Sequence, residues 1–167
     1  MSMPIQKIED HLDKIVVHRP RLQQLIDSYH NIILLGNGGS SAIASHIAED
    51  YTKVLKKRAF TFSDPSRLTC YTNDYGWNRA YLQFLKEFHT ENTLTILISS
   101  SGESKNIINC SEFCFKTQSP FIILTGFNKQ NSMRKKFKNK AAFEFHVDSC
   151  DYGVVECVHQ IFLHSII

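Results

Sequence analysis

Short segments rich in apolar residues alternate along the chain with longer segments in which apolar residues recur every three or four positions. A short apolar segment is typical of a strand buried on both faces, as in a parallel sheet, whereas the wider spacing is typical of a helix. The short segments predict five strands, at residues 32–35, 59–62, 94–98, 121–124 and 143–147.

Segments with helical spacing lie between these strands, at residues 40–55, 104–116 and 153–167, with further helices after residue 66 and around Tyr81 and Phe88. Residues 73–76, with the sequence Asn-Asp-Tyr-Gly, are predicted to form a turn. Strands that alternate with helices predict an α/β fold, a three-layer, doubly wound, open parallel sheet of about five strands flanked by helices.

The first 29 residues form a separate helical segment in this prediction, ahead of a domain that spans residues 30–167. Ser2 and Pro4 indicate a helix start, and apolar residues from Ile5 onward follow at helical spacing. Pro20 is expected to break or restart this helix because proline lacks the N–H that a helix interior uses.

The composition excludes several classes of protein. The 167 residues are 43% apolar and 21% charged, which argues against a disordered or collagen-like chain. No apolar run approaches the ~18 residues of a membrane-spanning helix, and the charged first thirty residues lack the apolar centre of a signal peptide. The five cysteines form no Cys-x-x-Cys pair, so we expect reduced thiols in a cytoplasmic protein. A net charge of +3 does not predict direct binding of nucleic acid.

A glycine-rich segment follows the first predicted strand. Gly36, Asn37, Gly38 and Gly39 lead into Ser40, where a helix is predicted to begin. Glycines allow a sharp turn and a close approach of a ligand, and the free N–H groups of a helix start favour an anion. The segment is neither a dinucleotide fingerprint nor a P-loop, so we expect no nucleotide cofactor. The alternative is a plain strand-to-helix turn with a serine cap.

A serine-rich segment follows the third predicted strand, with hydroxyl groups at Ser99, Ser100, Ser101 and Ser104. Hydroxyl groups and helix-start N–H groups can bind a phosphate monoester without a lysine. The alternative is a polar loop in which Ser104 caps a helix. Ligands of open α/β sheets bind beyond the carboxyl ends of the strands, so we expect this segment and the glycine-rich one to face the same crevice.

His46 and Asp50 lie four residues apart on the helix that is predicted to follow the glycine-rich segment. This spacing places them on one face, as a pair of metal ligands or as an acid/base group with its neighbour. A solvated ion pair is the alternative, and Glu49 competes with Asp50 for the role of carboxylate.

The last predicted helix carries Glu156, His159 and His164. Glu156 and His164 lie about 80° apart around a helix with ~3.6 residues per turn, so they can face one site. The alternative is that the histidine flanked by Phe162, Leu163 and Ile166 is a buried core residue with its hydrogen bonds satisfied.

The order of these segments resembles the sugar isomerase (SIS) domain, and within it the phosphoheptose isomerase branch. The resemblance rests on residues 36–40, 46–50, 63–64, 73–76, 99–104 and 124–126, and it covers residues 30–167. It implies a doubly wound α/β fold that assembles as a homotetramer, with sites shared between subunits and with the N-terminal helices in the oligomer packing.

The resemblance also implies roles for individual residues. The phosphate of a sugar phosphate would be held by Ser40, Ser99, Ser101 and Ser104. Gly38, Gly39 and Ser100, in the same two loops, are further candidate residues for binding the substrate or its phosphate. The sugar chain would be contacted by Asn37 and Asp74. Asp50 falls at the position of the family's base, which is a glutamate one methylene longer, and the family's histidine on the last helix falls on His164. Some members bind zinc through four side chains, which correspond to His46, Asp50, Glu156 and His164.

The implied reaction converts sedoheptulose 7-phosphate into D-glycero-D-manno-heptose 7-phosphate, for the heptose of lipopolysaccharide or capsule. Aldose–ketose isomerisation moves a proton between adjacent carbons through an enediol, and a carboxylate with a histidine suffices for it. We expect Asp50 to take the carbon-bound proton and His164 to transfer the hydroxyl proton. The alternative is a non-catalytic SIS module that acts as a sugar-phosphate sensor or as an adaptor for a replication initiator.

Overall fold

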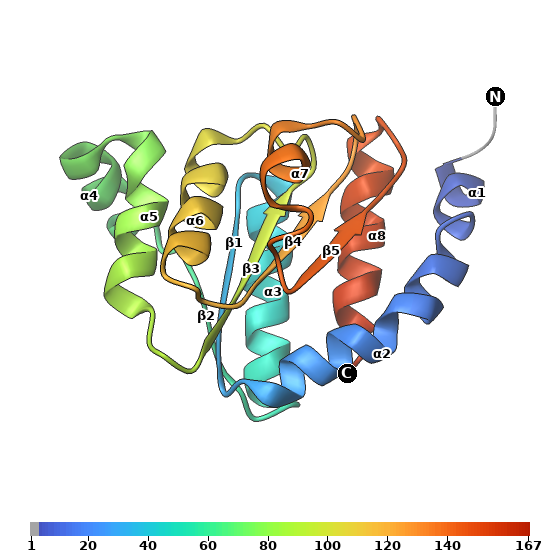
Figure 1. Cartoon of the computed structure of the whole chain (residues 1–167), viewed down its shortest axis with the longest axis horizontal. Helices are drawn as coiled ribbons and strands as arrows, with labels where there is room; N and C mark the ends of the chain where they lie inside the picture. Colours follow the sequence, from blue (N-terminus) through green and yellow to red (C-terminus); the bar gives the residue numbers. More distant parts are fainter. Residues whose placement is uncertain (1–3) are drawn as a thin grey trace.

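One parallel sheet forms the centre of the molecule. Figure 1 shows the computed structural model, which describes residues 4–167. The strands are β1 (Asn31–Gly36), β2 (Arg58–Thr61), β3 (Thr93–Ser99), β4 (Phe121–Thr125) and β5 (Phe143–His146), in the order β2-β1-β3-β4-β5. Every strand begins and ends within one residue of its predicted bounds, so the predicted parallel α/β sheet is confirmed.

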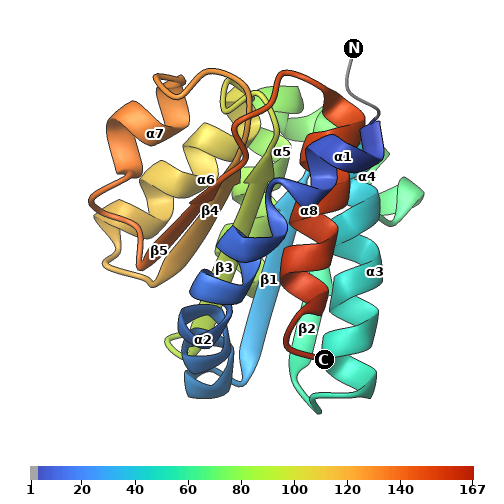
Figure 2. The same ribbon diagram turned by 90° about the vertical axis from the view of Figure 1, so that its right-hand side faces the viewer.

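Helices cover both faces of this sheet. Figure 2 shows α3 (Gly39–Lys53) and α8 (Tyr152–His164) on one face, with α6 (Lys105–Lys116) and α7 (Ser132–Phe137) on the other. The helices α4 (Pro65–Tyr75) and α5 (Trp77–Phe88) connect β2 to β3, and α5 packs beside α6. No helix within residues 4–167 combines the length and the apolar character that a membrane crossing requires.

The strand residues point alternately into two apolar cores. Ile32 and Leu34 of β1 pack with α2, α3 and α8, whereas Ile33 and Leu35 pack against α5 and α6. All four side chains are fully buried. A strand that is buried on both faces has no polar side to present, which explains why β1 is an unbroken apolar run in the sequence.

Two helices precede the sheet, α1 (Pro4–Glu9) and α2 (Leu12–Ser28), and their break differs from the prediction. The break lies at residues 10–11, while Pro20 lies inside α2. The carbonyl that loses its hydrogen bond to Pro20 belongs to Val16, which is exposed, so solvent can satisfy it. Burial of Leu22 and Ile26 holds the rest of the helix in place. Ser2, part of the predicted start signal, lies outside the described residues.

The turn predicted at residues 73–76 is wrong. Helix α4 continues through Tyr75 and ends at Gly76, whose N–H donates to the Thr72 carbonyl at 3.0 Å and whose φ is 74°. Gly76 then opens α5. Asn73 and Asp74 are tolerated in the helix because their side chains lie on its exposed side, where they do not compete for backbone groups.

A glycine is required at the end of β1. A Cβ at residue 36 would lie 2.7 Å from the carbonyl carbon and oxygen of Ser40, in the first turn of α3. We expect Gly36→Ala to lower the free energy of unfolding by about 2 kcal/mol, because the helix start must move away. Urea unfolding followed by circular dichroism measures this change.

The matched control is Gly153→Ala, in the first turn of α8. There the new Cβ would meet only a flexible Asp151 oxygen at 3.3 Å, and alanine favours the helix, so the change should stay below about 1 kcal/mol. Equal effects of the two substitutions would contradict the close approach at Gly36.

Candidate active site

The glycine-rich turn joins the carboxyl end of β1 to the start of α3. Gly38 has a φ of 55°, in the left-handed region that favours glycine. The buried Tyr81 hydroxyl donates to the Gly36 carbonyl at 3.2 Å. The Ser41 N–H donates to the carbonyls of Gly38 and Asn37, at 3.0 and 3.3 Å. Because the first N–H groups of a helix have no acceptor within it, the fixed turn offers donors to an anion.

The serine-rich turn joins the carboxyl end of β3 to α6 and is built from its own hydroxyl groups. The Ser99 hydroxyl lies 3.3 Å from that of Ser104 and accepts a bond from the Gly102 N–H at 3.2 Å. The Ser101 hydroxyl accepts from the Glu103 N–H, also at 3.2 Å. Gly102 has a φ of 67°, and a Cβ there would lie 2.2 Å from the Asn131 side chain. The turn is therefore closely packed and held in shape.

A pair of amide groups joins the two turns. The Asn37 Nδ2 donates to the Asn106 Oδ1 at 2.9 Å, and the Asn106 Nδ2 donates back to the Asn37 Oδ1 at 2.8 Å. Asn106 lies in the first turn of α6 and is buried, and the sequence analysis missed it. An asparagine at the start of a helix is common, so no sequence signal distinguished it.

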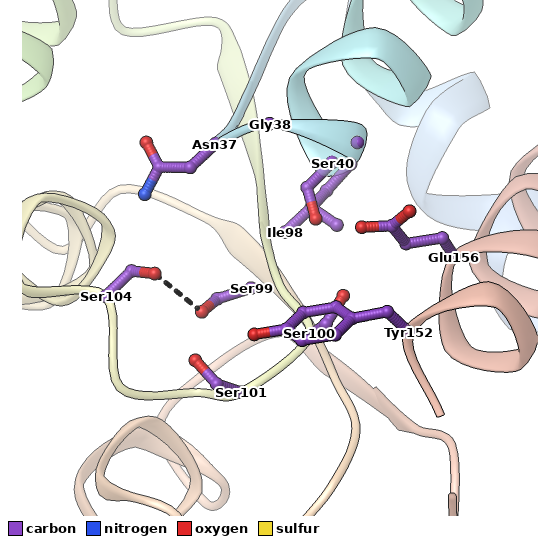
Figure 3. Close-up of a pocket in the computed structure, with 11 residues that line it drawn as sticks. Asn37, Gly38, Ser40, Ile98, Ser99, Ser100, Ser101, Ser104, Tyr152 and Glu156 are labelled. Atoms are coloured by element: carbon purple, nitrogen blue, oxygen red, sulfur yellow. Dashed lines mark hydrogen bonds between the residues drawn. The ribbon is translucent and has the colours of Figure 1, made fainter. Parts of the chain in front are cut away.

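The two turns line one cavity of about 240 Å³ at the edge of the sheet. Figure 3 shows side chains from the two turns, from β3 and from the starts of α3 and α8 around it. The structure thus brings together the loop residues that were expected to share a crevice. The lining residues are Asn37, Gly38, Gly39, Ser40, Ile98, Ser99, Ser100, Ser101, Ser104, Tyr152 and Glu156.

The cavity is polar, and hydroxyl groups dominate it. Ser100 is buried, and its hydroxyl has no hydrogen-bond partner among the described residues. Glu156 is the one charged side chain among the lining residues, and burial raises the pKa of its carboxyl. Tyr152 reaches across the cavity from the start of α8, and it was not predicted from the sequence. Hydroxyl groups and helix starts without a lysine suit a phosphate group.

A second cluster lies on the same side of the sheet, where α3 packs against α8. The Asp50 Oδ2 lies 3.0 Å from the His164 Nε2 and 3.4 Å from the His46 Nε2. The two imidazole rings lie 5.0 Å apart. The His46 side chain is 52% exposed and those of Asp50 and His164 are 24% and 31% exposed, so solvent and small molecules reach the cluster.

The packing of α3 on α8 positions this cluster. The fully buried Tyr51, next to Asp50, donates its hydroxyl to the Leu163 carbonyl at 2.9 Å, next to His164. Burial also raises the pKa of Tyr51 far above its usual value, so the hydroxyl keeps its proton and remains a donor. The neighbouring carboxylate and imidazole are therefore held on two fixed helices.

The structure does not place Glu156 in this cluster. Three of the four side chains that the resemblance implies as zinc ligands, His46, Asp50 and His164, offer donor atoms within 4.8 Å of one another. Glu156 instead lines the serine-rich cavity. On a helix with a rise of ~1.5 Å per residue, Glu156 and His164 are about 12 Å apart along the axis.

Two further candidates lie elsewhere. Asp74 is on the exposed side of α4, beside Asn73 and Cys70, and it does not line the cavity. His159 is a buried core residue: its Nε2 lies 3.1 Å from the Thr125 carbonyl, while its Nδ1 has no hydrogen-bond partner among the described residues.

Solved structures of phosphoheptose isomerases share the fold of this chain. The fold is that of phosphoheptose isomerase GmhA from Neisseria gonorrhoeae, with a TM-score of 0.85 and 21% identity over 98% of this chain and 91% of that one. A phosphoheptose isomerase from Francisella tularensis has a TM-score of 0.76 and 18% identity, over 99% and 96% of the two chains. No protein-family model matches the chain.

A sequence relative is also a phosphoheptose isomerase. The phosphoheptose isomerase of Fusobacterium nucleatum is 28% identical over 152 residues, which cover 88% of this chain and 76% of that protein. The chain is therefore an SIS-fold relative of the phosphoheptose isomerases, and the relatives support a phosphosugar isomerase, and so an enzyme.

Proposed function

We propose that the protein is an aldose–ketose isomerase that acts on a phosphorylated sugar by proton transfer through an enediol. One observation carries the proposal, the convergence of two hydroxyl-bearing turns on one cavity, with a carboxylate–histidine pair on the two helices that line that cavity. The turns supply neutral donors for a phosphate, and the pair supplies acid/base groups.

In this proposal the serine-rich turn fixes the phosphate end of the substrate. Ser99, Ser101 and Ser104 offer hydroxyl donors, and the start of α6 adds backbone N–H groups. Fixing that end orients the carbonyl end for proton transfer, which removes much of the entropic cost of reaction. Asn37 lines the cavity and is held in place by Asn106, so its amide can contact a hydroxyl group of the sugar.

Asp50 and His164 carry out the proton transfers. Asp50 removes the carbon-bound proton, and His164 transfers a proton between the two oxygens of the enediol. The His164 Nε2 lies 3.0 Å from the Asp50 Oδ2, so the carboxylate orients the imidazole and is close enough to share the same substrate atoms.

Neither Asp50 nor His164 lines the cavity of the same chain. This separation supports a site built from more than one copy of the chain. Asp50 lies ten residues along α3 from Ser40, which is about 15 Å at ~1.5 Å per residue. In a homotetramer, the pair on one subunit would act on a sugar phosphate held by a neighbour. Large exposed side chains on α2 and at the start of α5, including Val17 at 71% and Trp77 at 47%, support contacts of this kind.

The same cluster is proposed to bind zinc. Two imidazole nitrogens and a carboxylate oxygen are the donor types of catalytic zinc sites, which have three protein ligands. His46, Asp50 and His164 fit this set because their donor atoms lie within 4.8 Å of one another. When bound, the metal would polarise the substrate's carbonyl or hydroxyl oxygen.

The proposed substrate is sedoheptulose 7-phosphate, with D-glycero-D-manno-heptose 7-phosphate as the product. The direct experiment incubates the protein with this ketose phosphate in D₂O and follows deuterium incorporation at C1 and C2 by NMR. We expect exchange and formation of the aldose. Hexose and pentose ketose phosphates, tested in parallel, define the substrate class. If none of these sugar phosphates exchanged deuterium, the proposed isomerase activity would be refuted.

A sugar-phosphate sensor without catalysis is the second candidate. The observation that favours it is the same separation, since the cavity is complete within one chain whereas the catalytic pair is not part of it. Thermal-shift titration with sedoheptulose 7-phosphate reports binding without turnover, because occupancy stabilises the folded state. Stabilisation without deuterium exchange would identify the sensor.

A further inference from the structure

Glu156 stands out in the cavity proposed to bind a phosphate. The other ten lining residues have neutral side chains, so this carboxylate is the charge that an incoming anion meets. Figure 3 shows it extending from α8 toward Ser40, on the opposite side of the cavity from Ser101 and Ser104. The cavity thus has a hydroxyl-rich side and a carboxylate side.

The carboxylate lies close to the glycine-rich turn. A Cβ at Gly39 would lie 2.2–2.5 Å from the carboxyl atoms of Glu156, so the glycine provides the space that this side chain occupies. Glu156 is therefore packed against the first turn of α3, which also lines the cavity.

A carboxylate acts oppositely on the two ends of a sugar phosphate. It repels a phosphate dianion at short range, and it accepts hydrogen bonds from the hydroxyl groups of a polyol. The geometry points to Glu156 as a specificity-determining residue, which directs the phosphate toward the serine-rich turn and takes hydroxyl groups of the sugar on its own side. This inference rests on the proposed function and assigns the orientation of the substrate.

The assignment also separates Glu156 from the zinc cluster. The donor atoms of His46, Asp50 and His164 form one group, and Glu156 is not a member of it. A substitution that removes the charge of Glu156 should therefore change anion binding directly, through the cavity that it lines.

The test compares the wild-type protein with Glu156→Gln by isothermal titration at pH 8, with inorganic phosphate and with sedoheptulose 7-phosphate. Glutamine keeps the size and removes the charge. We expect phosphate to bind about tenfold more tightly to the variant, the effect of one nearby like charge in a partly solvated site. The sugar phosphate should gain less, because the weaker amide acceptor replaces the carboxylate, so the preference for the sugar phosphate over phosphate should fall.

Glu112→Gln is the control for net charge, because Glu112 pairs with Lys116 on the outer side of α6 and does not line the cavity. It should bind phosphate as the wild type does, and thermal unfolding checks that both variants fold. Equal or weaker phosphate binding by Glu156→Gln would overturn the inference while leaving the proposed function intact. Absence of binding to either ligand in the wild type would refute both.

Discussion

Asp50→Asn is expected to lower kcat for the isomerisation by about 10³-fold, the typical contribution of a positioned general base. Asparagine keeps the shape and can still accept a hydrogen bond from the His164 Nε2, now 3.0 Å from the Asp50 Oδ2. The variant loses the carboxylate charge and with it the ability to accept a proton. Coupled assays or NMR with sedoheptulose 7-phosphate measure the rate, and deuterium exchange measures the proton transfer directly.

Glu49→Gln is the matched control, since it removes the adjacent carboxylate on an exposed side of α3. Its kcat should change by less than twofold, at the level of a surface substitution. Asp50→Glu keeps a carboxylate and should retain much more activity than Asp50→Asn. If Asp50→Asn kept its activity, or if Glu49→Gln lost it, Asp50 would not be the base.

Mixing of variants tests whether the site is shared between subunits. Asp50→Asn and Ser101→Ala lie in the two separate parts of the proposed site. If one subunit's catalytic pair serves another subunit's cavity, co-expression of the two inactive variants should restore part of the activity, because some sites then combine two intact parts. No restoration, with light scattering showing a mixed tetramer, would place each site within one chain.

The protein should lose about 4 kcal/mol of stability between pH 7.5 and pH 5 through two buried histidines. His146 is 5% exposed and His159 is fully buried. Burial lowers the pKa of each to about 4, helped for His146 by Arg134 and Lys14. Both are therefore neutral in the folded protein, whereas in the unfolded chain they take up protons below about pH 6.5. Their contribution is fully present above that pH and is lost as the pH falls toward 4.

Urea unfolding at several pH values measures this loss. His146→Asn with His159→Gln replaces both rings by amides that do not titrate, so the dependence between pH 6.5 and 4 should become shallower. His30→Gln is the control, because His30 is exposed on the surface. An unchanged slope in the double variant would show that other groups cause the acid sensitivity.

The sequence was sufficient to predict the sheet because burial on both faces makes the strands apolar along their whole length. Ile33 and Leu35 point into one core and Ile32 and Leu34 into the other, so β1 has no polar position to confuse the pattern. The two loops were predictable for a related reason. Both follow strands of one parallel sheet, and such loops meet at the same edge.

Features that depend on packing were not predictable. The turn expected at residues 73–76 failed because Asn73 and Asp74, common in turns, lie on a solvent-exposed helix face, and only Gly76 breaks the helix. Tyr152 and Asn106 reach the site through the packing of α8 and α6 on the sheet, which no local pattern indicates. The positions of Glu156 and Asp74 relative to the other site residues likewise follow from the assembled helices.

The paired amides of Asn37 and Asn106 affect which ligands can enter the cavity. They connect the turn after β1 to the first turn of α6 with two hydrogen bonds, one in each direction. An arriving molecule thus meets walls at a fixed separation and does not have to order them, so little conformational entropy is lost on binding. Molecules that are too broad for the gap are rejected at entry, and discrimination by width precedes any chemistry.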